Sequence, residues 1–134
     1  MKTDPLDKLF SERIRRRAIK RVGGCERCLG LKFDIVKDSG EIFPAYMQLQ
    51  CAHLTGRWRK STRWDDDNGA GLCGGCHRVI DRDLEAKEEF IHRQLGGEGY
   101  DLLKARARTP ARYIDKAAIG LYLKAKIEEL KERR

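Results

Sequence analysis

The chain has 134 residues, 40% of them hydrophobic and 37% charged, which predicts a single domain with a thin core. Its formal net charge of +8, from 29 basic and 21 acidic residues, favours a polyanionic partner, of which nucleic acid is the commonest. No apolar run approaches the roughly 20 residues of a membrane span, and the N-terminus lacks the apolar segment of a signal peptide, so we expect no membrane contact and a cytoplasmic location.

Residues 1–24 are predicted to form a basic N-terminal helix. Asp4 suits the N-cap and Pro5 the first turn, while the glycines at 23–24 end the pattern. Apolar residues recur at three- and four-residue spacing over 6–22, and basic residues crowd the remaining positions. The basic side is either the solvated back of a docked surface helix or a surface that contacts phosphate directly.

A short β-hairpin is predicted next, with strands at 32–36 and 41–43 around a turn at 37–40. Pro44 interrupts the pattern. Residues 46–54 then alternate between larger apolar and polar side chains, which predicts a further strand.

Residues 55–64, TGRWRKSTRW, are predicted to form a long loop that contains no acidic residue. Its four basic residues are Arg57, Arg59, Lys60 and Arg63. Because bases interleaved with the aromatic rings of Trp58 and Trp64 can grip a sugar–phosphate backbone, we expect these four side chains to contact DNA. The alternative is that the tryptophans cap the core and the basic side chains are solvated.

The second half of the chain is mostly helical in pattern. The predicted elements are a turn at 65–69, a short strand at 70–72, a helix from 73 through 81, helices at 85–95 and 100–107 separated by two glycines, and a last helix at 113–130.

Four of the five cysteines form two CxxC pairs, Cys25 with Cys28 and Cys73 with Cys76. In a reducing compartment, paired CxxC sequences more often hold a metal than form disulfides. Zinc prefers four tetrahedral thiolate or imidazole ligands, so these four thiols predict a structural Zn²⁺ site, the alternative being a redox dithiol. We interpret Cys51, the fifth cysteine, as a small buried apolar residue.

Three further residues stand at fixed intervals around the second CxxC pair. His53 precedes Asn68 by 15 residues, and Asn68 precedes His77 by 9. The combination CxxC…H…N…CxxCH resembles the HNH, or ββα-metal, endonucleases. The resemblance implies an α+β fold with a small ββα-metal core that carries a structural four-cysteine zinc site and is flanked by N- and C-terminal helices. The single domain, residues 1–134, would comprise a basic N-terminal helix (1–24), a zinc-stapled ββα core (25–81) and a helical C-terminal extension (82–134).

The resemblance also implies a role for each residue. His53 would be the general base that deprotonates water, and Asn68 would orient it by binding backbone groups across the loop. His77 would bind a catalytic divalent ion (Mg²⁺, Mn²⁺ or Zn²⁺), and Asp81, four residues later on the same helix face, would be a second ligand. Ala52 departs from the family pattern, in which an aspartate or histidine often precedes the base.

The predicted function is therefore a metal-dependent DNA endonuclease of phage or mobile-element type, which nicks double-stranded DNA that it holds by backbone contacts. The alternative is a non-catalytic, zinc-finger-like module that binds DNA or RNA and has retained the fold. Ala52 in place of a metal ligand is the strongest sequence argument for the alternative.

Overall fold

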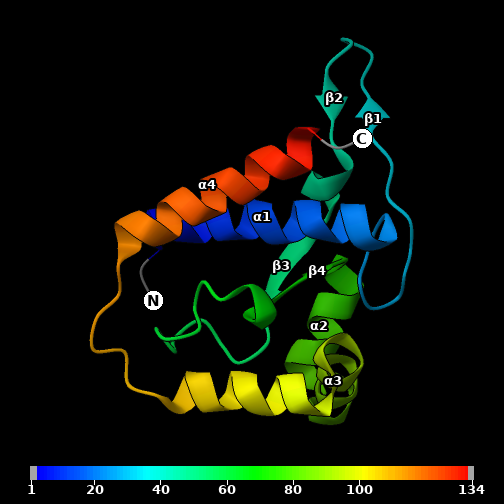
Figure 1. Cartoon of the computed structure of the whole chain (residues 1–134). Coiled ribbons are helices and arrows are strands. Elements are labelled where there is room, and N and C mark those ends of the chain that lie inside the picture. Colours follow the sequence, from blue (N-terminus) through cyan, green and yellow to red (C-terminus); the bar gives the residue numbers. More distant parts are fainter. Residues whose placement is uncertain (1–2, 133–134) are drawn as a thin grey trace.

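The computed structural model describes residues 3–132 and shows an α+β fold with two small antiparallel sheets (Figure 1). The elements are α1 (Pro5–Val22), β1 (Ile35–Val36), β2 (Ile42–Phe43), the 3-10 helix η1 (Ala45–Gln48), β3 (Gln50–His53), the 3-10 helix η2 (Asp66–Asn68), β4 (Gly69–Leu72), α2 (Gly74–Arg82), α3 (Leu84–Arg108) and α4 (Lys116–Glu132). Strand β1 pairs with β2, and β3 with β4. None of the helices in residues 3–132 combines the length and the apolar character needed to cross a membrane.

Helix α1 begins and ends as the sequence predicts. The carboxylate of Asp4 accepts the backbone N–H of Leu6 at 2.9 Å, and the carboxylate of Asp7 accepts the N–H of Asp4 at 2.8 Å. These two bonds satisfy N–H groups that the first turn of a helix leaves unpaired. The helix ends at Gly23, whose φ of 71° is left-handed and whose N–H donates to the carbonyl of Ile19.

The β3–β4 hairpin forms the middle layer, between α1 on one face and α2 with α3 on the other (Figure 1). In its antiparallel register, His53 lies opposite Gly69 and Ala52 opposite Ala70. Because side chains alternate along a strand, Cys51 and His53 face α1, whereas Ala52 packs in the core formed with α2 and α3. Successive residues of β3 therefore pack on opposite faces of the hairpin, one face against α1 and the other against α2 and α3.

Two glycines of β4 allow α1 to lie close against the hairpin. A Cβ atom at Gly69 would lie 2.7 Å from the Cγ1 of Ile14, and one at Gly71 would lie 2.6 Å from the Cβ of Ala18. Either distance is a steric overlap, so any larger residue would push α1 away. Gly69 was expected in a turn, but it begins β4, and its small size serves helix–strand packing instead.

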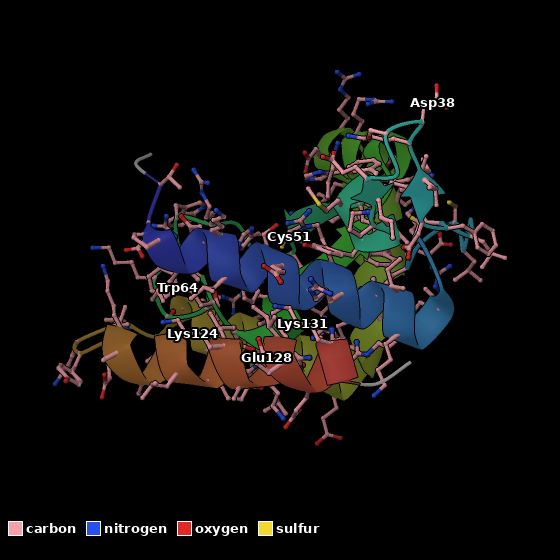
Figure 2. All side chains as sticks on the ribbon, turned by 90° about the horizontal axis from the view of Figure 1, so that it is seen from above. Asp38, Cys51, Trp64, Lys124, Glu128 and Lys131 are labelled. Carbon is pink, nitrogen blue, oxygen red and sulfur yellow. The ribbon has the colours of Figure 1, made fainter. Side chains whose placement is uncertain are left out.

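Helix α4 lies alongside α1 and runs in the same direction (Figures 1 and 2). An ion pair of 2.7 Å between Lys116 and Asp4 joins the beginnings of the two helices. The buried cluster between them and the loop that follows β3 consists of Leu6, Phe10, Ile14, Trp64 and Leu123. This second cluster compensates for the thin core that the composition predicts.

The predicted hairpin at 32–43 forms, but its strands are shorter than expected. The carboxylate of Asp34 accepts the N–H of Ala45 at 2.8 Å, and the side chain of Gln48 donates to the carbonyl of Phe33 at 2.7 Å. These bonds hold the chain before β1 against η1, so only Ile35–Val36 pairs with β2. The predicted strand at 46–54 is wrong in its first half, because residues 45–48 form η1.

The helical predictions for the second half are confirmed at one point and need one correction. The two helices predicted at 85–95 and 100–107 form the two parts of α3, which is broken at Gly96 by a non-helical φ of 75° and ψ of 167°. The last helix begins at Lys116 instead of residue 113, because the carboxylate of Asp115 accepts the N–H of Ala118 at 2.9 Å and acts as its cap.

Candidate functional site

The four cysteines of the two CxxC pairs come together where α1 ends and α2 begins. Their sulfur atoms all lie within 4.8 Å of one another. Thiolates that surround one zinc ion at about 2.3 Å lie roughly 3.8 Å apart in a tetrahedron, and the sulfurs of Cys28 and Cys73 are 3.9 Å apart. The predicted clustering is therefore confirmed, and the donor set and spacing fit one zinc ion.

The surroundings of the cluster act on its thiols in opposite directions. Burial opposes ionisation of Cys25, but backbone N–H groups of Cys73, Cys28 and Arg27 bring its pKa down to about 7. Burial and the neighbouring thiols raise the pKa of Cys76 to about 12, although a 3.5 Å hydrogen bond from Arg27 acts in the opposite direction. A zinc ion would ionise all four thiols, and the guanidinium of Arg27 would offset part of the resulting negative charge.

The first CxxC pair forms a tight knuckle whose backbone requires small residues. The N–H of Cys25 donates to the carbonyl of Gly30 at 3.1 Å, and that of Leu29 to the carbonyl of Cys25 at 2.9 Å. A Cβ atom at Gly24 would lie 1.9 Å from the Gly30 carbonyl oxygen, so only glycine fits there. The knuckle therefore presents both of its sulfur atoms on one side.

A buried carboxylate that no sequence motif signals fastens this knuckle to the hairpin. Glu26 is only 4% exposed, and its Oε1 accepts the N–H of Gly71 at 2.9 Å. Its other oxygen accepts the side-chain amide of Gln94 and lies 3.8 Å from Arg21, and its carbonyl accepts a 3.0 Å bond from Arg93. An acidic residue inside a CxxC pair is ordinarily solvated, so the sequence carries no signal for this role.

His53 ends β3 on the face that α1 covers. Its ring lies 5.3 Å from the ring of Phe10, between centroids, and its Nε2 lies 3.1 Å from the carbonyl oxygen of Arg63. Burial lowers the pKa of His53, while the bond to that carbonyl opposes the shift. The lowered pKa favours the neutral imidazole at pH 7. Because a carbonyl oxygen only accepts, Nε2 carries the proton, and Nδ1 is the nitrogen able to take one up.

Asn68 is fully buried and ties together the two ends of the loop that follows His53. Its Oδ1 accepts both the N–H and the hydroxyl of Thr55 at 2.7 Å, and its Nδ2 donates to the carbonyl of Thr62 at 2.9 Å. Thr62 immediately precedes Arg63, whose carbonyl holds the imidazole. Asn68 thus binds backbone groups at both ends of the loop.

His77 and Asp81 lie on one face of α2. The Nε2 of His77 is 3.6 Å from an oxygen of Asp81, and its Nδ1 is 2.7 Å from the Oε1 of Gln50. Ala52 is buried in the core beneath α2 and offers no ligand. Across residues 3–132, the four-cysteine cluster is the only group of three or more histidine, cysteine or carboxylate side chains close enough to share an ion.

The structure does not bring His53 and His77 together. His77 bonds to Gln50, which shares with Ala52 the face of β3 that α2 covers. His53 points to the opposite face, against Phe10 of α1. The residues of the motif therefore form two groups, His53 with Asn68 and His77 with Asp81.

The basic residues predicted to contact DNA have unequal surroundings. Arg63 is 8% exposed, and its guanidinium donates to the carboxylate of Asp7 at 2.9 and 2.6 Å. The indole of Trp64 donates to the same carboxylate at 3.0 Å and is buried in the second cluster. Arg63 and Trp64 therefore fasten the loop to α1, and Trp64 caps the core.

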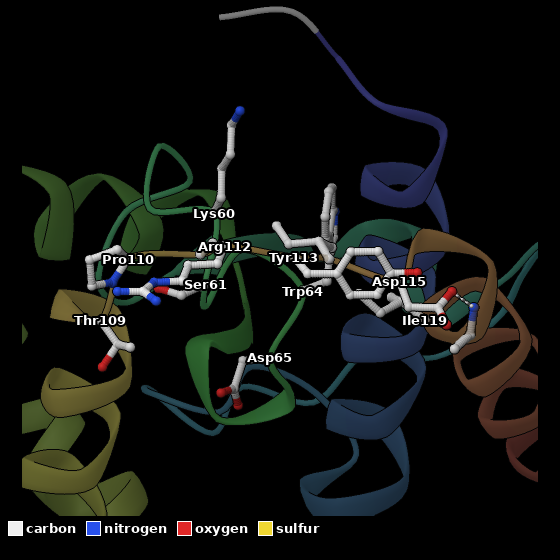
Figure 3. Close-up of a pocket in the computed structure, with 13 residues that line it drawn as sticks. Lys60, Ser61, Trp64, Asp65, Thr109, Pro110, Arg112, Tyr113, Asp115 and Ile119 are labelled. Carbon is white, nitrogen blue, oxygen red and sulfur yellow. Dashed lines mark hydrogen bonds between the residues drawn. The ribbon is translucent and has the colours of Figure 1, made fainter.

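The other three basic residues of the loop lie nearer the surface. The guanidinium of Arg59 lies 4.2 Å from the ring centroid of Trp58, which is 61% exposed, and Arg57 is half-buried. Lys60 is exposed at the rim of a hollow of about 800 Å³ between the loop and the α3–α4 connection, which Tyr113 also lines (Figure 3). Lys60 is thus the side chain of this loop best placed to meet a phosphate. Arg59 is half-buried, as Arg57 is, and its guanidinium also donates to the carbonyl of Ala107 at 3.4 Å.

Comparisons with family models, curated proteins and solved structures returned no significant match. The fold and the cluster define an α+β protein with a four-cysteine group that could hold a metal ion. The resemblance to the HNH endonucleases accordingly rests only on His53, Asn68 and His77, on their spacing and on the two CxxC pairs.

Proposed function

We propose that the protein is a zinc-stapled, metal-dependent DNA endonuclease. The observation that carries the proposal is the 3.1 Å contact between the His53 Nε2 and the carbonyl oxygen of Arg63, in a loop that Asn68 ties together. A general base must be unprotonated at the working pH and held in place. The contact orients the imidazole and burial lowers its pKa, which supports both requirements.

Each residue then has a defined task. Nδ1 of His53 takes a proton from water that attacks phosphorus, and the Arg63 carbonyl stabilises the imidazolium that forms. His77 and Asp81 would offer an imidazole nitrogen and a carboxylate to a divalent ion. When bound, such an ion stabilises negative charge on the phosphate and on the leaving 3′ oxygen. Arg59 and Lys60 hold the DNA backbone.

The separation of the two groups sets a condition on this mechanism. Base and ion must act on one phosphate, so a single phosphate has to reach both the His53 imidazole, in its bond to the Arg63 carbonyl, and the His77–Asp81 pair. The same separation, with Ala52 beside it, favours a second candidate function. In that function the chain is a zinc-stapled module that binds nucleic acid and does not cleave it.

Nicking of supercoiled plasmid by zinc-replete protein, in separate reactions with Mg²⁺, Mn²⁺ and Zn²⁺, distinguishes the two candidates. We expect nicking that depends on the added ion, a loss of about 10²–10⁴-fold in His53→Ala, and a loss in His77→Ala that excess metal partly restores. His92→Ala is the matched control, because His92 is an exposed histidine of α3 that contacts Tyr100. Wild-type protein that binds the plasmid without nicking it would establish the binding module instead.

A further inference from the structure

A groove of about 460 Å³ runs between the C-terminal halves of α1 and α4. Its lining residues are Arg13, Arg17, Lys20, Arg21, Lys126, Glu129 and Leu130. Five of these side chains are cationic and one is a carboxylate.

Arg17 places a buried positive charge in this groove. It is 6% exposed, and its guanidinium donates to the carbonyls of Asp66 at 3.0 Å and Gly69 at 2.9 Å. Among residues 3–132, no carboxylate lies within 4 Å of this guanidinium, and its buried Nε has no hydrogen-bond partner. Burial, and next the charge of Arg21, lower the pKa of Arg17. A bound anion would offset this charge, which the fold itself compensates only in part.

The carboxylates near the groove are too few to neutralise it. Three of them each pair with one cation, Asp66 with Arg13 at 3.2 Å, Glu26 with Arg21 at 3.8 Å and Glu129 with Lys126 at 3.3 Å. Three carboxylates therefore face five cations. The buried Nε of Arg13 also has no partner within the described chain.

Two further basic residues of α1, Arg15 and Arg16, have internal partners. The guanidinium groups of Arg15 and Arg16 lie 5.2 and 4.0 Å from the ring centroid of Tyr46, and Arg16 also bonds to Glu12 at 2.8 Å. The basic run of α1 is thus divided. One part packs on η1, and the other part, with α4, lines the groove.

We propose that the groove binds phosphate groups of a DNA backbone, as a second contact beside the loop that follows β3. The inference deepens the proposed function, because it presumes DNA as the partner. Asp66, which Arg13 binds, belongs to η2 at the end of that loop, so groove and loop adjoin. Asp7, which binds Arg63 of that loop, precedes Arg17 by ten residues, or about 15 Å along α1. At about 3.4 Å per base pair, the two contacts span roughly four base pairs.

Arginine is suited to this ligand. Its planar guanidinium binds two phosphate oxygens at once, and Lys20 and Lys126 add flexible point charges at the edges of the groove. Glu129 is the one lining group that would repel phosphate. Replacing Glu129 by a neutral residue should therefore raise the affinity for DNA, whereas removing a lysine of the groove should lower it.

The first experiment compares two double variants that remove equal charge. Lys20→Ala with Lys126→Ala strips the groove. Lys124→Ala with Lys131→Ala strips the opposite flank of α4, where both lysines are exposed (Figure 2). The pairs are matched, because Lys131 bonds to Glu128 as Lys126 bonds to Glu129, each across three residues. Anisotropy of a labelled 20-base-pair duplex, without added divalent ion, gives the affinity against salt concentration.

We expect the groove variant to lose at least about tenfold in affinity at 0.1 M salt, and its log–log salt slope to flatten by about 1.8, which is 0.9 for each of two phosphates. The control variant should stay within about twofold of wild type. Glu129→Gln should tighten binding about threefold, whereas Glu128→Gln on the other flank should not. Zinc content and circular dichroism establish that all the variants are folded.

A second arm separates a DNA phosphate from a free one. Inorganic phosphate alone is titrated while the backbone amides of Lys20 and Arg21 are followed by NMR. If phosphate shifts these amides but groove and control variants bind DNA equally, the groove takes a small anion and the inference is overturned. Equal DNA binding with no phosphate response overturns it as well. Because no cleavage is measured, a failure here is distinct from a failure of the endonuclease proposal.

Discussion

His53 and His77 face opposite sides of the β3–β4 hairpin, although the sequence places them in one motif. The imidazole of His53 lies against Phe10 of α1, and that of His77 bonds to Gln50 beneath α2. Variants at the two histidines should therefore disturb different surroundings. If both variants lose nicking while each disturbs only its own surroundings, the two histidines take part in the same reaction without sharing a packing contact.

Loss of one cysteine ligand should cost most of the stability. We expect wild-type protein to contain one zinc ion per chain, and Cys73→Ala to lose that ion and most of its cooperative unfolding transition. Structural zinc contributes on the order of 10 kcal/mol in small modules, which is comparable with the entire net stability of a typical domain. Elemental analysis and urea unfolding provide the two measurements.

Cys51→Ala is the control for this prediction. Cys51 lies on the α1 face of β3, outside the four-cysteine cluster, and burial raises its pKa to about 12. The variant should keep its zinc and lose at most about 1–2 kcal/mol by truncation. Wild-type protein that folds without zinc would contradict the metal assignment.

Features that depend on nearby residues were predictable from the sequence, and features that depend on distant contacts were not. The caps of α1 involve residues within three or four positions of each other, and two CxxC pairs leave little choice of partner. The roles of Glu26 and Gly69 were not predictable. Each depends on an element more than 40 residues away in the chain, so no local pattern signals it. The orientation of His53 depends in the same way on where α1 docks.

Asn68→Ala should destabilise the loop that holds His53. The change leaves the N–H of Thr55 and the carbonyl of Thr62 without their partner, and each unpaired buried group costs about 1–3 kcal/mol. We expect the free energy of unfolding to fall by about 2–4 kcal/mol in urea titrations, and the Thr55 amide to exchange faster with solvent. Asp67→Ala, at an exposed neighbouring site, should cost less than about 1 kcal/mol. An Asn68→Ala protein as stable as wild type would remove Asn68 from its bridging role.

Arg63 and Lys60 should behave differently although both belong to the basic loop. Arg63→Ala breaks a pair with Asp7 in which both side chains are at most 10% exposed, so we expect a loss of about 3 kcal/mol in stability. Lys60→Ala should leave stability within about 0.5 kcal/mol of wild type and flatten the salt slope of DNA binding by about 0.9. An Arg63→Ala protein that has normal stability but binds DNA weakly would contradict this prediction and would indicate that Arg63 contacts DNA directly.

The pH dependence of His53 follows from its burial. Burial lowers its pKa in the folded protein, whereas in the unfolded chain histidine titrates near 6.5. As the pH falls, the unfolded chain therefore takes up the proton first. The stability that the neutral imidazole contributes is complete above about pH 6.5 and is lost as the pH falls toward the folded pKa. Unfolding free energies of wild type and His53→Gln, measured from pH 7.5 to 5.5, should show the advantage of wild type shrinking over this range. Glutamine can still donate to the Arg63 carbonyl but does not titrate.

The lowered pKa of His53 also determines the expected pH profile of cleavage. Only the neutral imidazole accepts a proton, so the rising limb of kcat/KM should lie below pH 6.5, and activity should be nearly level from there to pH 8. His92→Ala, which alters an exposed histidine on α3, should show the same rising limb as wild type and a normal kcat/KM. His53→Gln should lose the limb together with nearly all of the activity, while its zinc content and DNA affinity stay unchanged, because a general base acts only in the transition state. A wild-type limb centred above pH 7, or one that persists in His53→Gln, would mean that a group other than this buried imidazole activates the water.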